Sequence, residues 1–296
     1  MNNLNQDINE YSYSKSIDLL FIVFTGFLFL VTIIFSDKIQ NWMGVALNFF
    51  LIGIIYILLS RLLQLIKKDF IQLFTRGILI AVFNGLIFTE IQHLQHIFVN
   101  GWLDQSLIDF DNKIFGIELT VAFDKITTPV LTEMMMFAYT IYVPLIVFVG
   151  IFCYVKSGKL AGEDYFFRLT LTYFLSYLGF LIYPIAGPLF YQPEIYNNQL
   201  SGWIFTYFGE WIRQNAHYPG GNLPSPHCAA GTIMLTMLWK YNKLIFYFLL
   251  PIIVLLYFST VYGRYHYAMD SITGILLGLL VFYFVEKIHK IARIIK

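Results

Sequence analysis

The chain has 296 residues, of which 58% are hydrophobic, 19% aromatic and 12% charged, and its formal net charge is +1. A soluble domain carries about 25% charged residues, so this composition excludes an ordinary water-soluble protein. The basic residues are dispersed along the chain, so we expect no nucleic-acid partner. Apolar runs longer than a β-strand predict an all-α, polytopic membrane bundle with about eight transmembrane helices.

Hydropathy places eight apolar stretches that are long enough, or nearly long enough, to cross a bilayer. The predicted spans are residues 17–35, 44–60, 77–98, 131–155, 165–184, 227–240, 244–262 and 270–286. The sixth is short for a crossing, and Pro144 is expected to kink the fourth. The first run is long for a signal-peptide core and lacks a small-residue cleavage pattern, so we expect it to be retained as a span.

The distribution of basic residues predicts the orientation in the membrane. With the N-terminus in the cytoplasm, the cytoplasmic side collects 14 of the 19 basic residues. These are Lys15, Arg61, Lys67, Lys68, Arg76, Lys156, Lys159, Arg168, Lys240, Lys243, Lys287, Lys290, Arg293 and Lys296. We therefore expect both termini in the cytoplasm, with the loops 99–130 and 185–226 and the turn 262–270 on the extracytoplasmic face.

The first outer loop, residues 99–130, contains the stretch GWLDQSLIDFDNKIFG. Its apolar and acidic residues are spaced as in an amphipathic helix that lies in the membrane interface. We expect the apolar residues to contact lipid and the aspartates to face water. The apolar set is Leu103, Leu107, Ile108 and Ile114, and the acidic set is Asp104, Asp109 and Asp111. A plain connecting loop is the alternative.

Ionisable residues also occur within the predicted spans. The third span ends with Glu90, His93 and His96, whose spacing places them on one broad helix face. Such residues at membrane depth are candidates for a functional site. We predict no metal site at this set of residues. The alternatives are a hydrogen-bonded group near the interface or the wall of a ligand cavity, to which Tyr139 of the fourth span would also contribute.

Two further polar stretches lie on the outer side, one at the end of the fifth predicted span and one at the start of the sixth. The fifth span ends in a helix-breaking turn, YPIAGPLFYQP, at residues 183–193. The second stretch is GNLPSPHCAAG at residues 221–231, where Ser225 is a strong N-cap and Pro226 suits the first helical position. His227 then lies in the first helical turn. Unpaired backbone N–H groups and a partial positive charge make such a helix start a suitable seat for phosphate.

The strongest concentration of polar residues is YGRYHYAMD at residues 262–270, between the last two spans. Arg264, His266 and Asp270 fall within seven positions of one another. Because Asp270 follows His266 by four residues, one helical turn brings the imidazole and the carboxylate to the same face. A carboxylate that holds an imidazole is the orienting half of a catalytic triad.

Together these stretches resemble the type-2 phosphatidic acid phosphatase superfamily. Residues 224–227, Pro-Ser-Pro-His, match its Pro-Ser-x-His motif, and residues 266–270 match the His-x-x-x-Asp core of its third motif. The 39 positions from His227 to His266 accommodate one membrane hairpin. The chain looks most similar to the inositol phosphorylceramide synthase-like (inositolphosphotransferase) branch, with its AGP turn and Tyr-x-Arg-Tyr-His-Tyr run, over roughly residues 99–286.

The resemblance implies a two-step phosphoryl transfer that needs neither a metal nor a cofactor. His266 would attack phosphorus and form a phosphohistidine, while Asp270 fixes its tautomer. His227 would protonate the leaving oxygen and then activate the acceptor. Ser225 and the backbone N–H groups of its helix would hold the phosphate oxygens.

The chain departs from the superfamily pattern in its cations. Gly187 and Leu189 stand near the positions of the first motif's Lys and Arg, and Thr260 stands at the Arg of the third motif. We expect Arg264 to take over phosphate binding. Further phosphate-binding candidates are Arg213 and His217, and the substrate-cavity candidates are Glu90, His93, His96, Tyr139 and Gly187.

These features predict an integral membrane enzyme that acts on a phosphorylated lipid, either as a lipid phosphatase or as a phospholipid headgroup phosphotransferase with an alcohol or lipid acceptor. Residues 1–62 would form a cytoplasmic tail and two accessory transmembrane helices. Residues 77–296 would form a six-helix catalytic membrane domain with the outer interfacial segment 99–130. The alternative is a non-catalytic lipid-binding or lipid-transport protein on the same scaffold.

Overall fold

The structure is a computed structural model that describes residues 13–295, and within this range it contains helices and no strands. The helices are α1 (Tyr13–Ile34), α2 (Trp42–Leu63), α3 (Asp69–Ile91), α4 (Asp104–Phe115), α5 (Leu119–Asp124), α6 (Pro129–Ser157), α7 (Lys159–Ile182), α8 (Pro188–Tyr191), α9 (Ile204–Ala216), α10 (Pro226–Tyr241), α11 (Lys243–Tyr262) and α12 (Ala268–Ile295). The predicted all-α class is confirmed.

Eight of these helices overlap the eight predicted spans, although α3 begins eight residues before the predicted third span and ends seven residues before its predicted end. Seven of them are long and apolar enough to cross a membrane, which makes the protein a multi-pass membrane protein. The eighth, α10, has only 16 residues and is buried along most of its length. The short sixth stretch is therefore a central helix of the bundle, largely enclosed by its neighbours.

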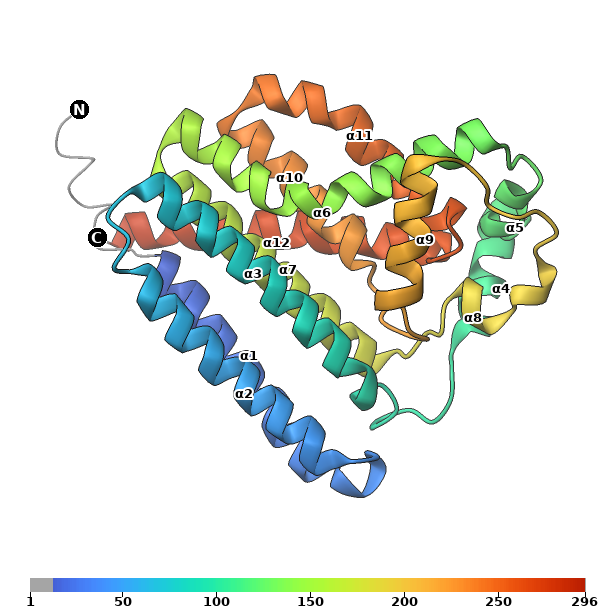
Figure 1. Ribbon diagram of the computed structural model, residues 1–296, viewed down its shortest axis with the longest axis horizontal. Coiled ribbons are helices and arrows are strands. Elements are labelled where there is room, and N and C mark those ends of the chain that lie inside the picture. The colour runs from blue at the N-terminus through green and yellow to red at the C-terminus, as the bar shows by residue number, and fades with distance from the viewer. Residues whose placement is uncertain (1–12, 296) are drawn as a thin grey trace.

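The long helices pack side by side, and the short ones gather at one end of the bundle (Figure 1). Helix α10 contacts α6, α7, α11 and α12, whereas α1 and α2 pair with each other along α3 and α7. Helices α4, α5, α8 and α9 lie at one end, and α1 begins and α12 ends at the other (Figure 1). We call the end with the four short helices the site end.

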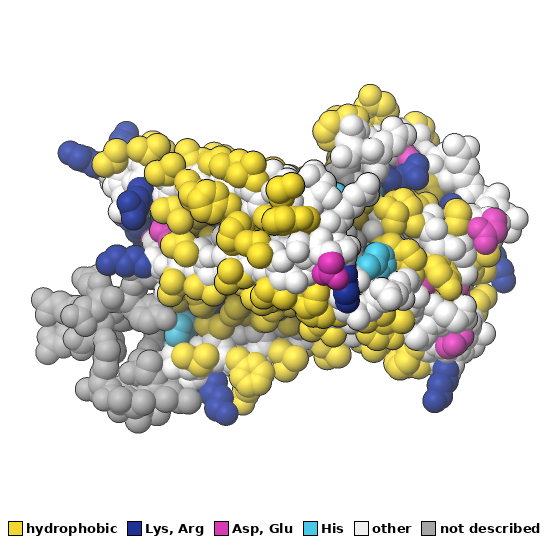
Figure 2. Space-filling view, turned by 90° about the horizontal axis from the view of Figure 1, so that it is seen from below, with side chains coloured by type: hydrophobic (Ala, Val, Ile, Leu, Met, Phe, Trp, Pro, Cys, Tyr) yellow, Lys and Arg dark blue, Asp and Glu magenta, His cyan; other side chains and the backbone are white. Residues whose placement is uncertain are grey.

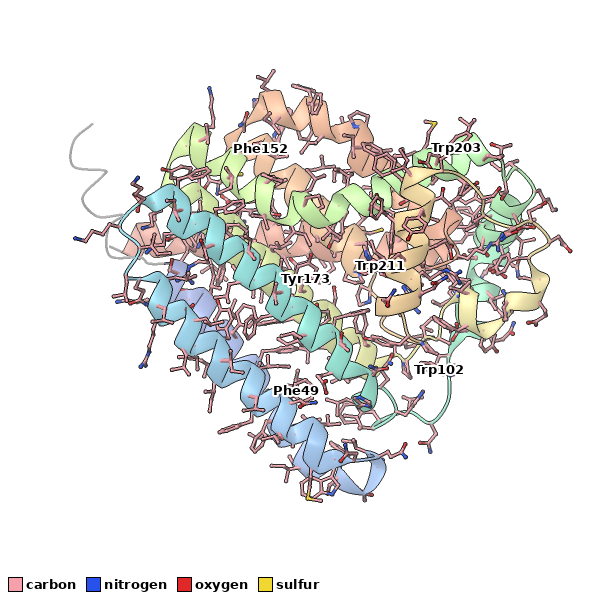
Figure 3. All side chains as sticks on the ribbon, in the orientation of Figure 1. Phe49, Trp102, Phe152, Tyr173, Trp203 and Trp211 are labelled. Carbon is pink, nitrogen blue, oxygen red and sulfur yellow. The ribbon has the colours of Figure 1, made fainter. Side chains whose placement is uncertain are left out.

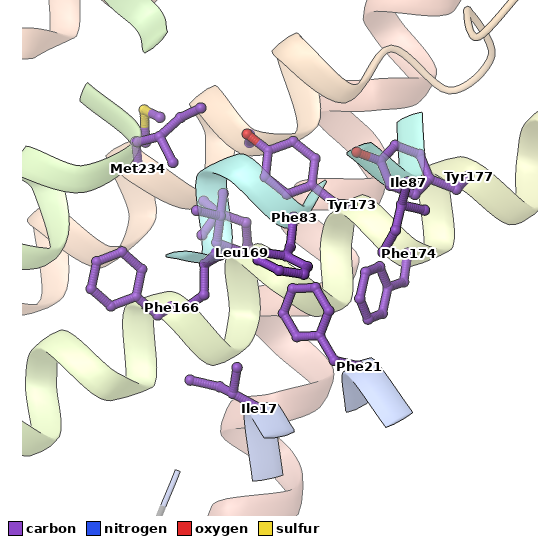
Figure 4. Close-up of a cluster of buried hydrophobic side chains, with 14 of the residues drawn as sticks. Ile17, Phe21, Phe83, Ile87, Phe166, Leu169, Tyr173, Phe174, Tyr177 and Met234 are labelled. Carbon is purple, nitrogen blue, oxygen red and sulfur yellow. The ribbon is translucent and has the colours of Figure 1, made fainter. Parts of the chain in front are cut away.

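Aromatic rings fill the interior between α1, α3 and α7 (Figure 4). Phe21 is fully buried, stacks on Tyr56 at a ring-centroid distance of 3.8 Å, and meets Phe174 edge-on at 5.1 Å. The exterior is also apolar, and in Figure 2 the Lys and Arg side chains lie mostly toward the two ends of the bundle. An apolar belt between charged ends is the surface that a bilayer requires.

A buried ion cluster joins three helices in the half of the bundle away from the site end. Arg168 of α7 is fully buried and donates to Asp164 at 2.7 Å and to Glu286 of α12 at 2.6 Å. Lys240 of α10 pairs with both carboxylates. Each charge has an opposite charge within contact distance, which offsets the loss of hydration.

Replacing Arg168 by Met should destabilise the protein by about 3 kcal/mol, because it leaves buried carboxylates short of a partner. Thermal unfolding in detergent would measure the change. Lys159→Met is the matched control, because Lys159 lies on the same helix as Arg168. Its ion pair with Asp69 of α3 is exposed, so its loss should change stability little. Equal shifts for the two variants would contradict the prediction.

Candidate active site

Two histidines meet at the site end, one from the start of α10 and one from the turn between α11 and α12. His227 lies in the first turn of α10, and the ring centroids of His227 and His266 are 5.9 Å apart. Ser225 is the N-cap and accepts a hydrogen bond from the Cys228 N–H at 3.4 Å, as the sequence predicted. The Ser225 N–H donates to the backbone carbonyl of Asp270 at 3.0 Å, which ties the two segments together.

His266 lies two residues before the start of α12 and Asp270 lies in the first turn of that helix, and both side chains are buried. The Nδ1 atom of His266 is 3.5 Å from Oδ2 of Asp270, a close contact that is too long for a well-formed hydrogen bond. Oδ2 instead accepts the Tyr267 N–H at 2.9 Å. Burial lowers the pKa of His266 to about 3, so its imidazole is neutral at physiological pH.

Aromatic side chains surround His227. The ring of Tyr139 stacks on it at a centroid distance of 5.0 Å, and Tyr142 lies at the same distance from another direction. Tyr139 also stacks on Tyr265 at 4.5 Å. The structure therefore places the predicted cavity residue Tyr139 directly beside His227 and Tyr265.

Buried polar atoms without a hydrogen-bond partner converge at this place. Among the described residues, they include Nδ1 of His227, Nδ1 of His266, Oδ1 of Asp270 and the hydroxyl of Tyr265. A buried polar atom without a partner costs about 1–3 kcal/mol, so such groups rarely persist without a functional reason. Four of them around two adjacent imidazoles indicate a site for a polar ligand.

Arg264 follows the end of α11 with a left-handed backbone, φ 62°. Its guanidinium donates to Asp124 of α5 at 2.6 Å and to the backbone carbonyl of Asn198, and it lies 4.4 Å from the ring centroid of Tyr196. Arg264 therefore reaches across the site end to α5 and to the 196–198 loop. The sequence did not predict this anchoring.

A cavity of about 400 Å³ adjoins the Arg264 turn. It is lined by Leu189, Gln199, Leu200, Glu210, Arg213, Gln214, Gly263 and Arg264. Two of the three predicted phosphate-binding cations thus share one cavity, although Arg213 forms an ion pair with Glu210. The third candidate, His217, packs its ring 4.9 Å from that of Tyr265, and burial lowers its pKa to about 3.

The remaining cavity candidates separate into two groups. Gly187 is close to the site, because a Cβ there would lie 2.5 Å from the Asn222 side chain and 3.1 Å from the carbonyl oxygen of Tyr265. Helix α3 ends at Ile91, before His93 and His96, which are exposed, and neither histidine lines the cavity. A continuous helix face through Glu90 and these histidines was therefore a wrong prediction.

Helix α4 is amphipathic, but the predicted surroundings were wrong for two aspartates expected in water and for Leu107 and Ile108, which pack against Ile185 and Tyr267 instead of lipid. Asp104 and Asp111 are fully buried, as are most of Leu107 and Ile108, whereas Asp109 is exposed. The physical reason is that both buried carboxylates accept backbone N–H groups that have no other partner. Sequence spacing marks the two sides of a helix and cannot tell which side meets protein.

The two buried carboxylates of α4 fix the turns on which the site is built. Asp104 accepts the N–H groups of Ala186 and Gly187 at 2.8 and 2.9 Å and the Tyr267 hydroxyl at 3.0 Å. Asp111 accepts the N–H groups of Ala268 and Met269 at 3.0 and 3.3 Å, which makes it an N-cap for α12 supplied from another helix. These hydrogen-bond partners of Asp104 and Asp111 all lie within three residues of His266 or Gly187.

Burial raises the pKa of Asp111 to about 6, so the carboxylate is still ionised at neutral pH and can accept both N–H groups. Asp111→Ala should cost about 1 kcal/mol of stability through the lost cap. It should also lower turnover, because the start of α12 carries Asp270. Asp109→Ala, on the exposed side of the same helix, is the control. If Asp111→Ala and Asp109→Ala change the thermal stability and the turnover by the same amounts, the proposed role of Asp111 is contradicted.

Comparison with known protein families matches residues 105–284 to the model described as PAP2 superfamily. The match covers 180 of the 296 residues and includes the start of α10, the turn before α12 and most of α4. Helices α1, α2 and α3 precede it. No curated protein and no solved structure shows a significant match to the chain.

Proposed function

The chain belongs to the PAP2 superfamily, and from this premise we propose that it is a membrane phosphoryl-transfer enzyme that acts on a phosphorylated lipid through a phosphohistidine. The observation that carries the proposal is the approach of His227 and His266, with ring centroids 5.9 Å apart, beside the buried carboxylate of Asp270. A scaffold that only binds lipid has no need of two facing imidazoles and a carboxylate.

In the first step, His266 attacks phosphorus. An Nδ1–H that points at Asp270 leaves the lone pair of Nε2 as the nucleophile, and the neutral state of the buried ring favours attack. The N–P bond forms as the bond from phosphorus to the leaving oxygen breaks, and His227 gives its proton to that oxygen. Asp270 stabilises the positive charge that develops on the His266 ring.

In the second step, the phosphohistidine transfers its phosphoryl group to water or to an alcohol. His227, now neutral, removes the acceptor's proton as the oxygen attacks phosphorus, and His266 leaves as a neutral imidazole. The Ser225 hydroxyl and the first N–H groups of α10 would hold the non-bridging oxygens, and the support is their position at the start of the helix that carries His227. Arg264 and Arg213 would supply the positive charge from the adjoining cavity.

The pH profile tests the protonation state of His266. Because burial lowers its pKa from the ordinary 6.5 to about 3, the nucleophile should stay neutral as the pH falls from 7 to 5. With a phosphodiester substrate, which does not titrate in this range, kcat/KM should show no loss near pH 6.5 that depends on His266. A fall in kcat/KM with a midpoint near pH 6.5 that shifts when Asp270 is replaced by Asn would show that the His266 ring is solvated. That result would contradict the prediction.

Hydrolysis and transfer differ only in the acceptor. The resemblance to the inositolphosphotransferase branch favours transfer of a phosphorylated headgroup to a lipid or sugar hydroxyl. Product analysis with and without an added alcohol would decide between them. A phosphorylated alcohol supports a phosphotransferase, whereas inorganic phosphate alone in both cases supports a lipid phosphatase.

A non-catalytic lipid-binding or transport protein is the second candidate. One observation favours it: both cavity arginines are already paired, Arg264 with Asp124 and Arg213 with Glu210. Equal, zero turnover of the wild-type protein and its His266→Ala variant over a broad panel of phospholipids would support this candidate.

We also propose that both termini are cytoplasmic and that the site end faces the extracytoplasmic side. The support is the positive-inside distribution, with most basic residues at the ends of helices away from the site. Labelling of an engineered cysteine at Lys113, an exposed position of α4, by an impermeant reagent on intact cells would test the orientation.

A further inference from the structure

Helix α9 exposes a continuous row of large apolar side chains. The row consists of Trp203 just before the helix and of Ile204, Tyr207, Phe208 and Trp211 within it, each more than half exposed. Figure 3 labels Trp203 and Trp211 at the two ends of this row. A soluble protein surface rarely presents so many aromatic side chains together. We call this row the aromatic face of α9.

The opposite side of α9 is fixed to the protein. Glu133 of α6 accepts the N–H groups of Trp203, Phe205 and Thr206 at 2.7, 2.8 and 3.1 Å, and it also accepts the Thr206 hydroxyl. A Cβ at Gly209 would lie 2.8 Å from the sulfur of Met136, which shows how closely the two helices pack. The aromatic face therefore points outward from a docked helix.

The position of α9 relates this face to the lipid-facing surface. The helix crosses α6 at a steep angle near the site end (Figure 1). Val130 and Met134, which flank Glu133 on α6, are 59% and 51% exposed, and α6 is one of the helices that can cross a membrane. The exposed apolar surface of a membrane helix thus continues onto α9 at the point where α9 is anchored.

The composition of the two sides of α9 fits a membrane interface. Trp and Tyr concentrate at the level of the lipid headgroups, where the ring is apolar and its N–H or O–H remains hydrated. On the inner side, Glu210, Arg213 and Gln214 line the 400 Å³ cavity. A helix with an aromatic side in lipid and a charged side on a polar cavity has the pattern of an interfacial helix.

We propose that α9 lies in the bilayer interface with its aromatic face in contact with phospholipid, so that the cavity on its other side opens at headgroup depth. A lipid can then place its headgroup against Arg213 while its acyl chains remain in the membrane beside Tyr207 and Trp211. The location of α9 does not depend on catalysis. The entry of a substrate along it rests on the proposed function.

Spin-label accessibility in nanodiscs of defined phospholipid tests the location. A nitroxide at Tyr207→Cys should be more accessible to oxygen, which partitions into lipid, than to an aqueous nickel complex. Met134→Cys is the matched lipid-facing control and Lys113→Cys the exposed control at a charged position. The native Cys153 and Cys228 are buried, and wild-type protein labelled in parallel measures their background.

Two outcomes would overturn the proposal. If the label at Tyr207 prefers the nickel complex as the Lys113 label does, the aromatic face is in water. If the label is protected from both reagents in proportion to protein concentration, a second protein copy covers this face instead of lipid. Protection from both reagents at all concentrations also argues against contact with lipid.

Kinetics separate this proposal from the proposed function. Tyr207→Ser combined with Trp211→Ser should raise the KM for a long-chain substrate in bilayers several-fold and leave the KM for a short-chain, water-soluble analogue unchanged. Equal effects on both substrates would contradict lipid entry along α9. No turnover of either substrate by the wild-type protein would instead contradict the proposed function, while the accessibility result would still stand.

Discussion

His266→Asn should reduce turnover by about 10⁴-fold or more, since removal of a nucleophile in a catalytic unit has effects of this size. Asparagine keeps a polar group of similar size near Asp270, so the buried turn should remain folded. The loss is chemical: an amide nitrogen has no lone pair available to form the N–P bond. Turnover of a labelled lipid and thermal unfolding of the same preparations would measure the two effects separately.

Trapping the intermediate gives the direct control for this prediction. Acid quenching destroys a phosphohistidine, so the reaction is stopped with alkali and the retained label is mapped to a peptide. The wild-type protein should carry label on the peptide with His266, and His227→Asn should accumulate more of it when the leaving group is activated, because transfer to the acceptor is slowed. Label retained by His266→Asn, or turnover within tenfold of wild type, would contradict the assignment.

The features that were predictable from the sequence depend on local spacing. Hydropathy marks a membrane helix from about twenty consecutive residues, so the sequence predicted all seven long apolar helices. It also predicted α10, although that helix has only 16 residues. The Ser225 cap depends on an interval of three residues at the start of α10, which the helix enforces whatever the rest of the chain does. The contact of His266 with Asp270 also spans only four residues, although it joins the turn before α12 to the first turn of that helix rather than two helical positions.

The features that were not predictable depend on partners far along the chain. Asp111 caps a helix whose first residues follow it by 157 and 158 positions, and Asp104 binds an N–H group 82 residues away. The amphipathic pattern of α4 was visible in the sequence, but burial of its acidic side follows only from those distant N–H groups. The aromatic face of α9 was hidden for a related reason, since the sequence alone showed an outer loop and not the helix that Glu133 anchors.

The Arg264–Asp124 contact is another long-range feature, because its partners are 140 positions apart in the sequence. It changes how the predicted phosphate ligand is understood, because the guanidinium is held by a carboxylate rather than free. An anionic substrate in the cavity would compete with Asp124 for this charge. Because Arg264 lies two residues before His266 and at the edge of the cavity, we still predict that it is the cation that binds the phosphate.

Arg264→Ala should lower kcat/KM by about 10²–10³-fold, the effect of removing one preorganised group that stabilises transition-state charge. The same substitution leaves Asp124, which is only 5% exposed, without its cation, so stability should fall as well. Loss of activity alone would therefore not separate a role in phosphate binding from a role in holding α5. Kinetics and thermal unfolding must be measured together.

The double variant Arg264→Ala/Asp124→Asn separates a role of Arg264 in phosphate binding from a role in holding α5. The second change removes the unpaired charge, while its side-chain oxygen can still accept from the backbone of Asn198 as Asp124 does. If Arg264 binds phosphate, the double variant should recover thermal stability and keep the low kcat/KM of the single variant. If turnover returns together with stability, Arg264 acts only by anchoring the turn, and the phosphate-binding assignment is wrong.

The single variant Asp124→Asn tests the same competition from the other side. It leaves Arg264 in place and removes its carboxylate partner, so the positive charge becomes available to an anion in the cavity. Inhibition by inorganic phosphate should then strengthen relative to wild type, and the gain should disappear in the double variant, which lacks the guanidinium. The two opposite shifts together would identify Arg264 as the group that meets the phosphate, because a purely structural pair would weaken binding in both variants.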